Sequence, residues 1–178
     1  TVSDAGSLAV IGGSSATTSI QSSSSTLTYA FGVTGGTFNA SYYSFDDLDA
    51  AGLAFSGTPT ITSLSNGSFE MATLFGNLIS LPTTTLSANA PKTISNVRFN
   101  SALGGNNVNL TGSTTNAWRF TGSYGNRAGE DYDVDGVSAC GSIRWDDSSC
   151  QLLQQTQYRW RNDDGGEGAP NDEWFDTD

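Results

Sequence analysis

Two stretches decide the fold class: SLSNGSFEMA (Ser63–Ala72) and TISNVRFNSA (Thr93–Ala102). Each alternates apolar and polar residues, passes through Asn, and reaches a Phe that precedes polar and small residues. A Phe in a similar setting recurs in GTFNAS (Gly36–Ser41) and WRFTGS (Trp118–Ser123). The four Phe lie at positions 38, 69, 99 and 120, with separations of 31, 30 and 21 residues. Such a period predicts a solenoid whose coils stack like residues above one another.

The segments between these stretches alternate in polarity and are short. LAFSG (Leu53–Gly57), NLISL (Asn77–Leu81) and NVNLTG (Asn107–Gly112) are separated by Gly, Asn and Pro. Alternation with this punctuation predicts short strands joined by tight turns. We therefore expect an all-β chain that forms a short parallel β-helix with a C-terminal β-rich cap. A β-sandwich, with the aromatic residues at ordinary core positions, is the alternative.

The two opening stretches resemble the coils of right-handed parallel β-helix proteins. In that family of secreted surface proteins and polysaccharide-acting enzymes, an inward Phe, Ile or Val stacks beneath turns rich in Asn and Gly. The resemblance covers roughly residues 30–122. It implies an extracellular or cell-surface location, a β-solenoid fold, and either a structural or a polysaccharide-related role.

The segment before the repeats is expected to be an extended arm. Residues 1–30 are rich in Ser and Thr, and Asp4 is the one charged side chain among the first 45 residues. Apolar residues at Leu8, Val10 and Ile20 predict strand, so this arm could add as a strand to a neighbouring copy. The alternative is an ordinary first strand and N-terminal cap of the solenoid itself, because solenoid ends need covering. The solenoid repeats are expected over residues 31–122.

The C-terminal part, residues 123–178, is expected to form an acidic, aromatic-rich β unit. IRWDD (Ile143–Asp147) and YRWRNDD (Tyr158–Asp164) repeat one theme, with aromatic and cationic residues on opposite sides of a strand. These phrases resemble segments of large, multidomain bacterial cell-surface proteins, a likeness that covers about residues 115–178 and implies a surface location. The tryptophans either stack on sugar rings or fill the core. They are Trp118, Trp145, Trp160 and Trp174.

Composition restricts the partners and the compartment. The net charge of −11 and the pI near 4.1 repel nucleic acid and anionic membranes. No stretch approaches the roughly 18 to 20 apolar residues of a membrane helix, so we expect no membrane insertion. Cys140 and Cys150 are the two cysteines, and in a chain of this composition they predict an extracellular protein with one disulfide. Two free, buried thiols are the alternative.

The run EDYDVDG (Glu130–Gly136) matches the first half of a calcium loop. Asp131, Asp133 and Asp135 offer oxygens at alternate positions and Gly136 permits a sharp turn. The twelfth position of the loop would be Ser142 and not a bidentate Glu, which excludes an EF-hand. Calcium, the candidate cofactor, would need further oxygens. We expect these from the Val137 carbonyl, Asp146 and Asp147, with Asp163 and Asp164 as other sources. A solvated acidic turn whose carboxylates pair with arginines is the alternative.

Catalytic chemistry has few candidates in this chain. Because His is absent, a Ser-His triad and a His-bound zinc are excluded. Asp46, Asp47 and Asp49 could supply a carboxylate pair for glycoside cleavage, although their spacing favours a polar turn. We therefore expect a non-catalytic, self-assembling subunit of a surface fibre or layer. The alternatives are a module that binds cell-surface or matrix glycans and a polysaccharide-acting β-helix enzyme.

Overall fold

The computed structural model describes residues 1–24, 26–136 and 141–146, and in these residues the chain forms a parallel β-solenoid of about five turns. The prediction of an all-β, β-helical fold is confirmed. Every ladder between the described strands is parallel. The β-sandwich alternative is therefore wrong, because a β-sandwich is built from antiparallel sheets.

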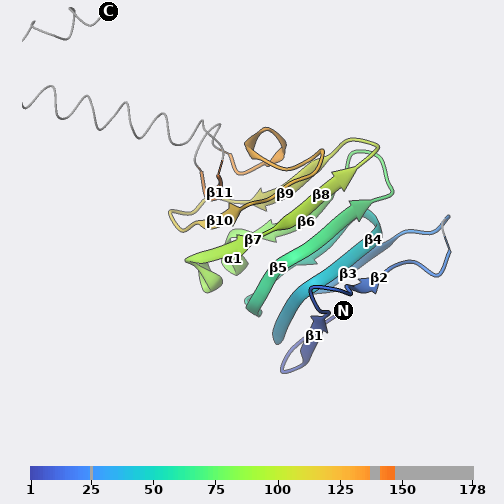
Figure 1. Ribbon diagram of the computed structural model, residues 1–178. Helices are drawn as coiled ribbons and strands as arrows, with labels where there is room; N and C mark the ends of the chain where they lie inside the picture. Colours follow the sequence, from blue (N-terminus) through green and yellow to red (C-terminus); the bar gives the residue numbers. More distant parts are fainter. Residues whose placement is uncertain (25, 137–140, 147–178) are drawn as a thin grey trace, which may run out of the picture. The chain divides into compact units, whose positions relative to one another are not determined.

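The strands follow one another around the solenoid axis (Figure 1). In chain order they are β1 (Ser7–Ile11), β2 (Thr18–Ile20), β3 (Tyr29–Val33), β4 (Thr37–Phe55), β5 (Thr60–Met71), β6 (Asn77–Pro82), β7 (Lys92–Ser95), β8 (Val97–Ser101), β9 (Asn106–Thr111), β10 (Trp118–Thr121) and β11 (Ile143–Trp145). A helix, α1 (Thr83–Asn89), follows β6, and a 3-10 helix, η1 (Glu130–Tyr132), precedes β11. Strand β4 bends through a whole turn, since β1, β2 and β3 each pair with a different part of it.

Three faces result from this stacking. Face A contains β1, the beginnings of β4 and β5, and then β7, β10 and β11. Strand β7 lies beside β5, where the backbone N–H of Ser95 donates to Oγ of Ser65 (3.0 Å). Face B contains β2, the middle of β4, the end of β5, and β8. Face C contains β3, the end of β4, β6 and β9.

Asn residues form the corner between faces A and B in the third and fourth turns. Asn66 and Asn96 have φ of 57° and 56°, a left-handed conformation that Asn tolerates better than most residues. The side-chain amide of Asn96 donates to Oδ1 of Asn66 (3.0 Å), so the corner residues are also joined to each other. This explains the shared Ser-Asn of the two opening stretches, since Asn both turns the chain and links adjacent turns.

Aromatic rings stack through the interior. Phe45, Phe69 and Phe99 are fully buried on face B, with ring centroids 5.6 and 5.7 Å apart along the stack. Of the four repeated Phe, Phe69 and Phe99 share one register. The other two, Phe38 and Phe120, lie on face A opposite Ile61 and Ile94. The predicted equivalence of all four is therefore wrong, and Phe45 occupies the position in the second turn that the sequence period assigned to Phe38.

The segment expected as an extended arm, residues 1–30, forms most of the first turn. Strands β1 and β2 and the start of β3 pair with β4, and Val10 is buried. This placement matches the alternative of an N-terminal turn that belongs to the solenoid. Apolar alternation explains it, because inward residues of the first turn cover the end of the core that β4 would otherwise expose.

Candidate functional site at the N-terminal turn

The N-terminal turn ends the described part of the solenoid, with strand edges that have few partners. In the described residues, β1 and β2 pair with β4 on one side and have no strand on the other. The outer side of β3 is covered at one point, where Val2 bridges to Val33. Figure 1 shows these three blue strands at one end of the stack. Unpaired N–H and C=O groups on such edges are templates for a further strand.

The residues expected to mediate assembly divide into two groups. Val10 is 3% exposed and belongs to the core, so its side chain is not available at the surface. Leu8 and Ile20 are partly buried and pack against the end of the core, as do Tyr29 and Phe31. The apolar interior is thus only partly covered at this end.

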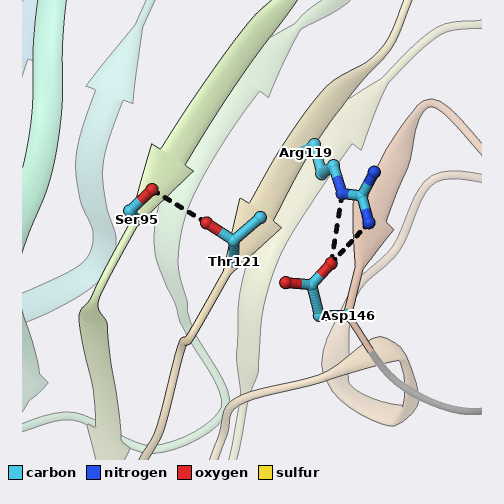
Figure 2. A network of polar contacts seen from close by, with 4 residues as sticks. All are labelled: Ser95, Arg119, Thr121 and Asp146. Carbon is cyan, nitrogen blue, oxygen red and sulfur yellow. Dashed lines mark hydrogen bonds and ion pairs between the residues drawn. The ribbon is translucent and has the colours of Figure 1, made fainter.

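Ile11 is a surface residue that the sequence patterns did not single out. It begins an outward row on face A that continues through Ser41 and Ser65. The row goes on through Ser95 and Thr121, whose hydroxyl oxygens are 2.8 Å apart (Figure 2). Hydroxyl residues therefore occupy this position in the four turns beyond the edge, whereas the edge itself carries an Ile that is 54% exposed. Only knowledge of the strand register could reveal this contrast.

The edge strands also lack the charged residues that usually protect open edges. Residues 5–45 contain no Asp, Glu, Lys or Arg, and no Pro. Natural edge strands are commonly protected by Lys, Pro or inward charges. The first turn has none of these devices, so its edge is chemically suited to pair with another strand.

The acidic run mostly holds the end of the described solenoid together. The indole Nε1 of Trp145 donates to Oδ2 of Asp133 (2.6 Å), and the backbone N–H of Ile143 donates to Oδ2 of Asp135 (2.9 Å). Asp135 is 5% exposed, whereas Asp131 is exposed. Two of the three predicted calcium ligands therefore accept hydrogen bonds from β11.

The remaining calcium ligands are not brought together by the described residues. Asp146 accepts two hydrogen bonds at Oδ1, from Nη2 of Arg119 (2.7 Å) and from Nε of Arg119 (3.1 Å), as Figure 2 shows. Val137 and Asp147 lie outside the described residues, as do Asp163 and Asp164. Within the described part of the chain, no three acidic, Cys or His side chains are arranged to hold a metal ion. Calcium binding stays a prediction.

Other predicted residues also have identifiable places. Trp118 and Trp145 are buried, so both belong to the core, while Trp160 and Trp174 lie outside the described residues. Cys140 and Cys150 also lie outside them, and their disulfide stays a prediction. No described helix is both long and apolar enough to cross a membrane.

The acidic turn of the second coil is engaged in local hydrogen bonds. Asp46 accepts from the hydroxyls of Ser44 (2.6 Å) and Ser19 (2.9 Å), and Asp49 accepts from the backbone N–H groups of Ala51 and Gly52. Burial, reinforced by Asp46 and Asp47, raises the pKa of Tyr29, whose hydroxyl donates to the Ile20 carbonyl (2.6 Å). These contacts support a structural turn and link β2 and β3 of the end coil.

Two further ionisable groups have pKa values shifted by burial. Burial raises the pKa of Tyr43, whose hydroxyl donates to the Leu64 carbonyl (3.0 Å) inside the core. Burial also lowers the pKa of Lys92, whose Nζ donates to the Ile61 carbonyl (2.6 Å). Each group hydrogen-bonds to a carbonyl of the adjacent turn, so both join turns of the solenoid.

The chain was compared with protein-family models, with curated proteins and with solved structures. No protein-family model, no curated protein and no solved structure matches the chain.

Proposed function

We propose that this chain is a non-catalytic structural subunit of an extracellular fibre or surface layer, and that it assembles through the edges of its N-terminal turn. The observation that carries the proposal is the combination of open edges on β1 and β2 with a partly apolar end whose strands, β1, β2 and β3, carry no charged side chain. A strand added there would satisfy backbone groups and remove Ile11, Leu8 and Ile20 from water.

The solenoid itself supports a structural role. Backbone ladders, the Phe stack and the Asn corner join neighbouring turns, so the described turns form one continuous stack. A stack with open strand edges is a suitable building block, because adding a copy extends a sheet that already exists.

Ile11→Ser tests this proposal with little risk to folding, since Ser already occupies the equivalent position at Ser41. We expect wild type to self-associate, and we expect the variant to raise the dissociation constant about tenfold, because each copy loses a half-exposed Ile from the contact. Sedimentation equilibrium measures the constant, and negative-stain imaging shows whether fibres or layers form.

Leu74→Ser is the matched control, because Leu74 is exposed but lies in the loop between β5 and β6, away from the N-terminal turn. It should leave association unchanged. A wild-type chain that remains monomeric at all concentrations, or equal effects of the two variants, would contradict assembly through the N-terminal edge.

Glycan binding is a second candidate function, supported by one observation. Phe75 is 81% exposed and adopts φ of 52°, which is unfavourable for an aromatic residue. Its ring lies next to Gly104 of the next turn, and the sequence neighbours of these two residues, Leu74 and Leu103, are also exposed. An exposed ring can stack on a sugar. A glycan array with wild type and Phe75→Ala tests this, and binding that is unaffected by the substitution would argue against the Phe75 surface.

A further inference from the structure

The N-terminal edge can meet two different surfaces of a second copy. In a head-to-tail contact, β1 would lie against the far end of the described part of face A, at β11. In a symmetric contact, the N-terminal turns of two copies would meet around a two-fold axis, with β1 antiparallel to the partner's β1. Both arrangements extend face A, but they place different side chains beside each other.

The outward rows of face A show what a head-to-tail contact would bring together. One row runs from Ala9 through Asn39 and Ser63, and at the far end it contains Thr93, Arg119 and Arg144. The neighbouring row runs from Ile11 to Thr121 and reaches Asp146, the residue after β11. A head-to-tail contact would therefore place Ile11 near the Asp146 carboxylate and Ala9 near the Arg144 guanidinium. Covering the Arg144 guanidinium and the ion pair of Asp146 with Arg119 by uncharged residues would cost desolvation energy without supplying further opposite charges.

A symmetric contact avoids that cost. A two-fold axis places a surface against itself, so any net charge on the surface would be opposed by the same charge on the partner. The chain carries a net charge of −11, yet residues 5–45 carry no charged side chain at all. Strand β1 thus belongs to a long uncharged stretch of the chain, where self-contact brings little repulsion.

We propose that the assembly begins with a symmetric dimer in which two N-terminal turns meet and β1 pairs antiparallel with β1 of the second copy. This inference rests on the proposed function and specifies its first contact. Ala9 is the middle residue of β1, points outward on face A and is exposed. Two antiparallel β1 strands centred near Ala9 bring its side chain next to Ala9 of the other copy.

Charges placed at Ala9 test the geometry. Ala9→Lys and Ala9→Glu each put like charges opposite each other in a symmetric dimer. Each variant alone should therefore raise the dissociation constant about fivefold or more, and an equimolar mixture of the two should restore association to wild-type strength or better. Sedimentation equilibrium of each variant and of the mixture, at low and at high salt, measures this. The rescue should weaken at high salt because the new pair is exposed.

A head-to-tail contact gives the opposite pattern, so the experiment separates the two arrangements. There, Ala9→Glu would strengthen association by pairing with Arg144, Ala9→Lys would weaken it, and mixing would restore nothing. That result would overturn the symmetric dimer while leaving the proposed function standing. A monomeric wild type would overturn both. Thr93→Lys and Thr93→Glu are the matched controls, since Thr93 is exposed in the same outward row but lies on β7 in the interior of the sheet. An effect of the Thr93 pair equal to that of the Ala9 pair would also overturn the symmetric edge contact.

Discussion

The third turn and the first turn contain the same kind of aromatic residue in different surroundings. Phe69 lies between Phe45 and Phe99 and is fully buried. Phe31 packs on Phe45 with ring centroids 5.3 Å apart, but it is partly exposed because its turn ends the described stack. The comparison teaches that each turn depends on both neighbours for burial. An end turn with one neighbour keeps apolar surface that a further strand or copy could cover.

Alanine substitutions at these two positions measure the difference directly. Phe69→Ala removes a ring from the middle of the stack and should lower the free energy of unfolding by about 3 to 5 kcal/mol. Phe31→Ala should cost about half as much at a concentration where the chain is monomeric, since its ring loses less burial. Urea unfolding curves give both values. Equal losses would mean that the first turn is already covered as completely as the third.

The fold class was predictable from sequence, but the register of the turns was not. The alternation of apolar and polar residues and the repeated Ser-Asn pairs predict short parallel strands, and the structure confirms these strands. The corners between faces A and B, however, fall at Tyr42, Asn66, Asn96 and Gly122, with separations of 24, 30 and 26 residues. α1 falls in the longest of these intervals. Because the turns differ in length, no fixed period can align them all. A fixed period therefore aligns Phe38 wrongly with Phe69.

The candidate site could likewise be predicted only in part from the sequence. The low charge of the first turn is visible in the sequence, and so is its apolar alternation. The contrast between Ile11 and the hydroxyl row behind it depends on which residues stack across turns, a relation between residues about 25 to 30 positions apart. The acidic run also needed three-dimensional context, because its hydrogen-bond donors, Ile143 and Trp145, come from a later strand.

Substitutions in the acidic run Glu130–Gly136 should change stability by an intermediate amount. Asp135→Ala would leave the buried N–H of Ile143 without its acceptor and should destabilise the chain by about 1 to 3 kcal/mol. Asp131→Ala, at an exposed position of the same run, should change stability by less than about 0.5 kcal/mol. Thermal unfolding of both variants, in buffer with a chelator, checks this difference without any contribution from metal.

Calcium can be tested with the same variants. If the run binds the ion, calcium should raise the melting temperature of wild type, and Asp131→Ala should reduce that increase. If Asp133 and Asp135 serve only to hold β11, melting curves with calcium and with chelator should coincide. That result would favour the structural interpretation of EDYDVDG.

The ion pair between Arg119 and Asp146 should contribute least, although its geometry is good (Figure 2). The two side chains are 57% and 38% exposed, so water and salt screen their attraction, and both must lose side-chain freedom to meet. We expect a double-mutant cycle with Arg119→Ser and Asp146→Ser to give a coupling of about 0 to 1 kcal/mol that decreases in high salt. A larger coupling that persists in salt would mean that this end of face A is covered in solution. Asp146, one of the charges that we infer to disfavour head-to-tail contact, would then already be neutralised by Arg119, and the preference for symmetric contact at β1 would lose part of its physical basis.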